Sequence, residues 1–332
     1  MSGSREATGH DGGRAPSAGA WKAQPPRATV VICAYTMRRW RQLAAAVDSV
    51  RAQTHPPAQL VVVIDHNDDL LVLSRRHLAD GEVLASTGPP GLSGARNSGL
   101  AVTDSDVLAF LDDDAVAEPD WLAELCRPYA DRAVMGVGGR VVPAWQAGRP
   151  TWFPDEFDWV VGCSHRGLPT GPATIRNPIG ANMSFRTGAL RDAGGFTTHI
   201  GRLGTRPFGC EETEAAIRIA RRHPGTRIAY QPAAVVRHHV PPTRATVHYF
   251  RTRCWSEGLS KAEVARLTTV RQAVEVERRY ATRTLPRGVL AGVVEAVRHA
   301  RPAAAARAAM IIAGLAVTTA GYAAGRLKSF GS

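Results

Sequence analysis

The sequence predicts an α/β protein with helices packed around a sheet that is parallel at first and mixed further along the chain. Two short β-branched runs, Thr29–Ala34 (TVVICA) and Leu60–Asp65 (LVVVID), predict strands. Between them, residues 38–53 place apolar side chains at helical spacing. Because strands that alternate with helices form parallel sheets, these three segments predict a parallel sheet wrapped by helices.

A third predicted strand, Val107–Leu111 (VLAFL), runs directly into the aspartate triplet Asp112–Asp114. In open α/β sheets, ligands collect at the carboxyl ends of the strands. We therefore expect residues 34–36, residues 65–68 and the aspartate triplet to lie along one edge of the sheet.

Beyond Ile179 the predicted elements become mixed, and two prolines at 241–242 mark a boundary. The elements before it are the strand Ala181–Arg186, the short helix Gly188–Ala193, the helix Glu211–Arg222 and the strand Arg227–Arg237. The helices after it are His248–Ala265 and Val270–Thr284. We therefore divide the chain into a disordered tail (1–27), one α/β domain (28–245) and a basic helical C-terminal region (246–332).

Composition limits the class of protein. With 332 residues, 44% of them apolar, the chain can bury a substantial core. Residues 1–27 are rich in Gly, Ser, Ala and Pro without an apolar run, so we expect a mobile tail and no signal peptide. The 5 cysteines are widely spaced without a CxxC pair, which indicates reduced thiols in a cytoplasmic protein.

The net charge of +12 is concentrated at the C-terminal end of the chain. Residues 246–332 contain 14 Arg or Lys against 5 Glu, whereas the charges of residues 28–250 nearly cancel. This distribution argues against nucleic-acid binding by the α/β domain. Residues 308–325 form an almost uncharged run, so a basic helix lying on anionic lipid is the favoured interpretation. A membrane-spanning helix and an ordinary helix packed on the domain are the alternatives.

Adjacent carboxylates at a strand end repel one another unless something neutralises them. A divalent cation is the simplest remedy, and oxygen ligands suit Mg²⁺ or Mn²⁺. Taken alone, the triplet Asp112–Asp114 is equally compatible with a turn that caps a helix.

Seven motifs decide between these interpretations. In chain order they are VVICAY, VVVIDHND, GLSGARNSG, FLDDDA, NPIGANMSFR, GCEETEAAIR and VVRHH. Their order and spacing over about residues 28–240 resemble the family 2 inverting glycosyltransferases, which have the GT-A fold of nucleotide-diphospho-sugar transferases. The resemblance implies transfer of one sugar from a nucleotide diphosphate to a hydroxyl or phosphate acceptor, with Mn²⁺ or Mg²⁺ as cofactor.

The resemblance also implies roles for individual residues. It assigns Glu212 as the catalytic base, with Glu211 as the alternative, because the family has Glu-Asp where this chain has two glutamates. The implied metal ligands are Asp114, Asp112 and His238, with His239 as the adjacent possibility. The implied nucleotide-sugar-binding residues are Ala34, Tyr35, Asp65, Arg96, Asn97, Asp112, Asp113 and Asn182.

Each assignment has a structural alternative. The two glutamates open a helix, where the helix dipole favours acidic residues in any case. Asp65 and Arg96 are also compatible with turn and helix-start positions, although we expect GLSGARNSG itself to be a loop. The aromatic residues of the connection 144–178 predict either a sugar platform or a small additional core.

Other protein classes fit the sequence less well. A nucleotidyltransferase would carry a glycine-rich phosphate loop after the first strand, where this chain has AYTMRRW. An inactive membrane-bound module that binds nucleotide sugars is a second alternative. Processive synthases carry QxxRW or RxxRW, whereas residues 251–255 read RTRCW, so we expect no polymerising enzyme. For Trp255 we expect a buried core position, with a place facing the acceptor cleft as the alternative. The basic C-terminal region favours a polyprenyl phosphate or cell-envelope glycan as acceptor, at the inner face of the cell membrane, and a soluble small molecule is the alternative.

Overall fold

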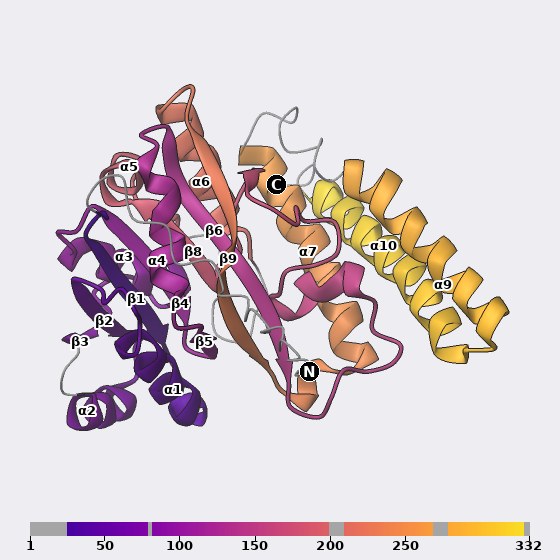
Figure 1. Ribbon diagram of the computed structural model, residues 1–332, viewed down its shortest axis with the longest axis horizontal. Coiled ribbons are helices and arrows are strands. Elements are labelled where there is room, and N and C mark those ends of the chain that lie inside the picture. The colour runs from indigo at the N-terminus through magenta and orange to yellow at the C-terminus, as the bar shows by residue number, and fades with distance from the viewer. Residues whose placement is uncertain (1–24, 79–81, 199–208, 268–277, 329–332) are drawn as a thin grey trace, which may run out of the picture.

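The computed structural model describes residues 25–78, 82–198, 209–267 and 278–328 (Figure 1). The predicted tail therefore lies outside the described residues, apart from its last three positions. The same holds for residues 270–277 of the predicted helix Val270–Thr284.

The described residues form a nine-stranded mixed sheet with the order β3-β2-β1-β4-β8-β6-β9-β5, and β7 pairs with β9. The first four strands of this order are parallel, whereas β8 is antiparallel to both of its neighbours. The predicted change from a parallel to a mixed sheet is thus confirmed. The strands are β1 (Ala28–Ala34), β2 (Gln59–Ile64), β3 (Glu82–Ala85), β4 (Val107–Asp112), β5 (Ala115–Ala117), β6 (Val134–Trp145), β7 (Ala173–Ile175), β8 (Asn182–Arg186) and β9 (Arg227–Val240).

Helices cover both faces of the sheet (Figure 1). They are α1 (Trp40–Arg51), α2 (Asp68–His77), α3 (Leu92–Val102), α4 (Trp121–Cys126), α5 (Thr187–Asp192), α6 (Glu211–Arg222), α7 (Val247–Leu267), α9 (Leu285–His299) and α10 (Pro302–Lys328). Shorter helical turns are η1 (Met37–Arg39), η2 (Arg127–Ala130), η3 (Asp155–Val161), η4 (Pro242–Arg244) and η5 (Tyr280–Thr284).

Side-chain alternation along β1 explains the two cores. Val30 and Ile32 pack with α1, α2 and α4 on one face, whereas Val31 packs with α3, α5 and α6 on the other. Since both faces of β1 are buried, a continuous apolar run is what this strand requires.

The segment GLSGARNSG is a helix, α3, and the prediction of a loop was wrong. Its glycines lower the helix propensity, so a prediction from local propensity fails for this segment. They are needed because α3 lies very close to its neighbours: a Cβ at Gly94 would collide with the Pro89 carbonyl, and one at Gly99 would lie 2.7 Å from Val31. Tertiary packing therefore overrides local preference here.

The aromatic residues of the connection 144–178 form core. Phe153 and Phe157 are fully buried and stack against Phe250 of α7 at ring-centroid distances of 5.5 and 5.2 Å. This packing favours the additional core over a sugar platform. Trp255, on the same helix α7, is 41% exposed, so the prediction of a buried tryptophan was wrong.

The C-terminal helices pack on this core from one side. α10 lies along α7, and α9 lies outside α10 (Figure 1). A Cβ at Gly258 would collide with the backbone of Thr318, and one at Gly321 with the backbone of Trp255. The two helices α7 and α10 therefore approach backbone to backbone, while α9 packs on another side of α10.

Candidate active site

The carboxyl ends of β1, β2 and β4 meet at one edge of the sheet, as predicted. Cys33 pairs in register with Asp112, and the Asp65 amide donates to the Ala34 carbonyl at 2.8 Å. Asp65 accepts from the Gly91 amide at 2.9 Å. Its carboxylate thus fixes the entry to α3.

Tyr35 extends this edge toward solvent. It is 42% exposed, and its carbonyl accepts a 3.0 Å hydrogen bond from Asn67 Nδ2. The Arg39 guanidinium lies 5.6 Å from the Tyr35 ring centroid. An exposed aromatic ring beside Ala34 and Asp65 leaves this edge open to a planar ligand.

Asp114 and His238 are brought together by strand pairing. β5 follows the aspartate triplet and pairs antiparallel with β9, which sets Ala115 opposite His238. Asp114 Oδ1 lies 3.1 Å from His238 Nε2, and both side chains are buried. Ligand atoms of Asp112, Asp114 and His238 all lie within 4.8 Å of one another.

His239 points elsewhere. Its Nε2 lies 3.4 Å from Gln42 Nε2, while its backbone amide donates to the Asp114 carbonyl at 2.8 Å. Of the two adjacent histidines, His238 therefore faces the aspartates.

Two arginines pair with the last two aspartates of the triplet. Arg39 Nη1 lies 2.7 Å from Asp113 Oδ1 and 3.2 Å from Asp114 Oδ2, and Arg244 Nη2 lies 3.5 Å from Asp114 Oδ2. Burial opposes ionisation of Asp114, but His238, Arg39 and Arg244 outweigh it and hold the pKa of Asp114 below its ordinary value. Burial and the adjacent Asp114 raise the pKa of Asp113 to about 7.

These residues fit a hard divalent cation. Asp112 and Asp114 offer carboxylate oxygens and His238 offers an imidazole nitrogen, a donor set that Mn²⁺ accepts. Within the described residues, the buried Asp113 Oδ2 has no hydrogen-bond partner, so the cluster also holds unused acceptor capacity.

Arg96 connects the triplet to the acidic pair. It is almost fully buried between Phe110 and Phe196, with ring-centroid distances of 5.7 and 5.5 Å. Its Nη1 lies 2.9 Å from Glu211 Oε1, and its Nη2 lies 3.5 Å from Asp112 Oδ1. The predicted nucleotide-binding arginine is thus engaged by protein carboxylates here.

Glu211 and Glu212 differ sharply in environment. Glu211 is buried against Arg96, whereas Glu212 is half-buried and accepts a 3.3 Å hydrogen bond from Thr213 Oγ1. Burial and the neighbouring Glu211 raise the pKa of Glu212 to about 8. Glu212 is therefore the member of the pair suited to exchange a proton.

The two predicted asparagines hold backbone. Asn97 joins Phe196 through two hydrogen bonds of 2.7 and 2.8 Å. Asn182 has no exposed surface, donates to the Arg140 and Ala234 carbonyls, and accepts from Trp121 Nε1 at 2.8 Å. Because its amide is fully used, Asn182 acts in this conformation as a structural residue that joins β8, β6 and β9.

A cleft of about 340 Å³ opens beside Asp114. It is lined largely by polar side chains, among them Arg38, Arg39, Gln42 and Arg244. Sequence reasoning missed Arg39 and Arg244. The sequence held a signal for each. Arg39 belongs to a basic pair just after the first predicted strand, and Arg244 follows shortly after the histidine pair.

A family model described as glycosyl transferase family 2 matches residues 29–194, half of the chain. The chain belongs to this family. It is 35% identical over 239 residues to glucosyl-dolichyl phosphate glucuronosyltransferase of Haloferax volcanii, with 71% of this chain and 76% of that one covered. It is also 31% identical over 162 residues to the pre-mycofactocin glycosyltransferase of Mycobacterium tuberculosis, covering 48% of this chain and 32% of that protein.

Among solved structures, the glycosyltransferase resembles a mannosyltransferase of Pyrobaculum calidifontis in complex with GDP-Man and Mn²⁺. The TM-score is 0.57 at 19% identity, over 91% of this chain and 90% of that one. This likeness, with the mixed sheet described above, establishes the GT-A fold.

Proposed function

We propose that this glycosyltransferase is metal-dependent and inverting, and that it uses a nucleotide-diphospho-sugar donor. The observation that carries the proposal is the convergence of Asp112, Asp114 and His238 at the edge of the sheet where β1, β2 and β4 end. Arg96 ties the same edge to the acidic pair on α6 through Asp112 and Glu211. Metal ligands, donor edge and base thus belong to one connected site.

The proposed reaction is a single in-line displacement. A divalent cation held by Asp112, Asp114 and His238 would stabilise the negative charge of the departing diphosphate. Glu212 accepts the proton of the acceptor hydroxyl as its oxygen bonds to the anomeric carbon. The bond from that carbon to the diphosphate oxygen breaks with its electron pair, which inverts the configuration. Glu211, fixed by Arg96, holds the start of α6 in place.

The acceptor class we propose is a lipid-linked phosphate or glycan at the inner face of the cell membrane. Support comes from the Haloferax volcanii relative, whose name specifies a glucosyl-dolichyl phosphate. The basic C-terminal region is consistent with an acceptor that resides in a membrane.

A donor screen tests the proposal. UDP- and GDP-sugars are incubated with the full chain, with and without Mn²⁺, and free nucleotide diphosphate is measured. Release with one donor, dependent on the cation, supports the proposal, and the product anomer then reports inversion. Binding of a donor without any turnover, with every acceptor class supplied, would favour the inactive binding module instead.

A further inference from the structure

The outer helix of the C-terminal hairpin has an unusual exposed surface. Leu290, Val293, Val294 and Val297 are 64%, 47%, 37% and 79% exposed, respectively. Their spacing of i, i+3, i+4 and i+7 places them on one stripe of α9. We call these four residues the α9 stripe. A helix of a soluble protein normally packs such a stripe against the protein core. The exposure of this stripe therefore indicates a surface that binds a partner or a membrane.

An apolar groove continues the stripe onto α10. The groove between α9 and α10 has a volume of about 410 Å³ and is lined only by apolar residues. Leu290 and Val293 of the stripe line it together with Ile312 and Leu315 of α10, which are 58% and 38% exposed. The two helices therefore share one apolar face.

The charges around this face are almost entirely positive. Residues 278–328 contain nine Arg or Lys and one acidic residue, Glu295. Arg287 and Arg298 are exposed on α9 at either end of the stripe. Apolar side chains framed by arginines are complementary to an anionic bilayer surface, where acyl chains lie beneath negatively charged headgroups.

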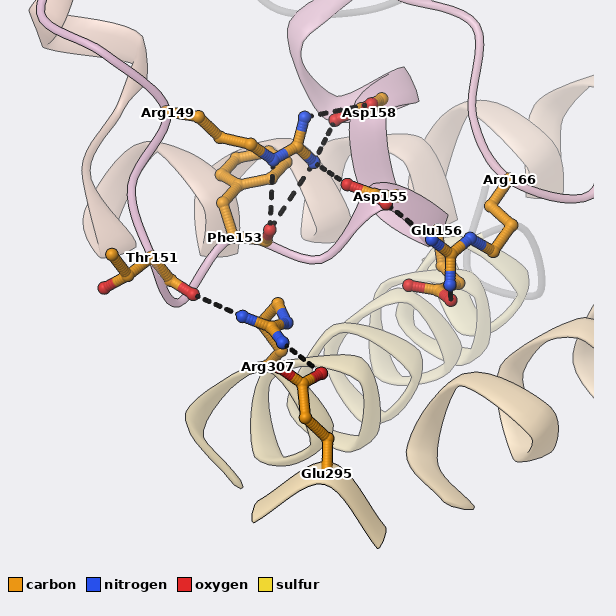
Figure 2. A network of polar contacts seen from close by, with 9 residues as sticks. All are labelled: Arg149, Thr151, Phe153, Asp155, Glu156, Asp158, Arg166, Glu295 and Arg307. Atoms are coloured by element: carbon orange, nitrogen blue, oxygen red, sulfur yellow. Dashed lines mark hydrogen bonds and ion pairs between the residues drawn. The ribbon is translucent and has the colours of Figure 1, made fainter. Parts of the chain in front are cut away.

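The single acidic residue of this region is partly exposed and is paired with two arginines. Glu295 Oε2 lies 2.8 Å from Arg307 (Figure 2). Its Oε1 lies 3.3 Å from Arg301. Arg307 also donates to the Thr151 carbonyl at 3.3 Å, which ties the hairpin to the aromatic connection. Glu295 therefore does not place a free negative charge on the apolar face.

The acidic residues of η3 are paired in the same way. Arg149 lies 2.8 Å from Asp155 and 2.7 Å from Asp158, while Arg166 lies 2.7 Å from Asp155 and 3.4 Å from Glu156 (Figure 2). Each of these carboxylates is thus paired with an arginine, so η3 adds little uncompensated negative charge beside the hairpin.

The packing of α10 argues for a helix that lies on the membrane. Within the described residues, one helix, Pro302–Leu327, is long and apolar enough to span a bilayer. Its most apolar stretch has a mean hydropathy of 1.6, and 22% of that stretch is buried. However, the glycine face of α10 packs against α7, which carries Glu257 and Lys261 as an ion pair at 3.8 Å. Lipid cannot surround α10 without removing α7, so only the outer face is available.

We propose that the α9 stripe and the adjoining α10 groove form a monotopic docking surface for an anionic bilayer. In this arrangement α9 inserts at the level of the headgroups, and no segment spans the bilayer. This deepens the proposed function and rests on it for its purpose, because it would hold the active site beside a lipid-linked acceptor. Vesicle binding is measured without donor or acceptor, so docking and transfer can fail independently.

The test compares flotation of the full chain with phosphatidylcholine–phosphatidylglycerol vesicles and with pure phosphatidylcholine vesicles. We expect binding to the anionic vesicles that weakens as salt is raised. Leu290→Ser with Val297→Ser should lower partitioning by tenfold or more, on the order expected for losing two inserted aliphatic side chains. The matched control is Val72→Ser on α2, whose side chain is 58% exposed; it should leave binding unchanged.

A second pair of variants tests the charge. Arg287→Gln with Arg298→Gln should weaken binding by about fivefold per arginine. The matched control is Arg75→Gln with Arg76→Gln, two exposed arginines of α2. Equal losses in the α9 and α2 variants would overturn the proposal, because binding would then depend on net charge alone.

Three further outcomes would also overturn it. The first is an absence of binding to either vesicle. The second is attachment that resists salt and yields only to detergent, which would indicate a spanning helix. The third is a serine pair that converts a dimer into a monomer while vesicle binding persists, which would make the surface a contact between two copies of the chain. Donor hydrolysis in solution should be the same in all variants.

Discussion

The guanidinium of Arg96 lies 2.9 Å from the carboxylate of Glu211, although the two residues are 115 positions apart in the chain. The same guanidinium reaches Asp112 at 3.5 Å and the Gly180 carbonyl at 3.2 Å. Arg96 therefore joins the end of β4 to the start of α6. It fixes the distance between the aspartates and the acidic pair, which makes it a positioning residue for the proposed base.

Arg96→Gln should destabilise the protein by roughly 3–5 kcal/mol, because it leaves Glu211 buried without its charge partner. Unfolding by urea, followed by circular dichroism, measures this loss. The control is Arg227→Gln, which breaks the exposed pair with Asp131 and should cost far less stability because water screens that pair. Similar losses in the two variants would show that the buried pair has no special role.

Asp114→Asn should abolish Mn²⁺-dependent donor turnover, because an amide oxygen replaces a carboxylate in the proposed ligand set. It should also remove the rise in melting temperature that Mn²⁺ with nucleotide diphosphate gives the native chain. Asp104→Asn is the control, since Asp104 is 78% exposed in its side chain and pairs with Arg27 at 3.6 Å. A variant with unchanged turnover would remove Asp114 from the metal site.

The elements that could be predicted from sequence are those whose local pattern agrees with their burial. β1 and β4 are continuous apolar runs because both their faces are covered, and α6 was predicted with its observed bounds, Glu211–Arg222. β6 escaped prediction because it contains Gly136, Gly138 and Gly139, which read locally as a break. Gly139 is required because a Cβ there would collide with the Asn182 amide.

The candidate site divides in the same way. The aspartate triplet and His238 could be found because their motifs are local. The pairing of Arg39 with Asp113 and of Arg96 with Glu211 could not, since a charged side chain carries no local pattern that names a partner far along the chain. Such pairings exist only once the sheet order has brought β1, β4 and α6 to one edge.

Glu212→Gln should lower turnover by on the order of a hundredfold or more, because the amide cannot accept the acceptor proton. Donor and Mn²⁺ affinity, measured by titration calorimetry, should survive. Glu211→Gln is the informative companion, and its main effect should be lost stability through its partner Arg96. If Glu211→Gln is catalytically dead but stable, the two roles are reversed.

The raised pKa of Glu212 predicts two opposite pH trends. Burial and Glu211 raise this pKa from 4.5 to about 8, so the proton-accepting form increases with pH and turnover should rise up to about pH 8. Folding favours the protonated form of a carboxyl whose pKa is raised, so its contribution to stability is complete below about pH 4.5 and is lost as the pH rises toward 8.

Glu212→Gln carries no titrating proton and should flatten the stability trend in this window. Urea unfolding of both proteins between about pH 5 and 9 measures the difference. If the stability of the two proteins changes with pH in the same way, Glu212 titrates near its ordinary pKa, and the prediction of a raised pKa is wrong.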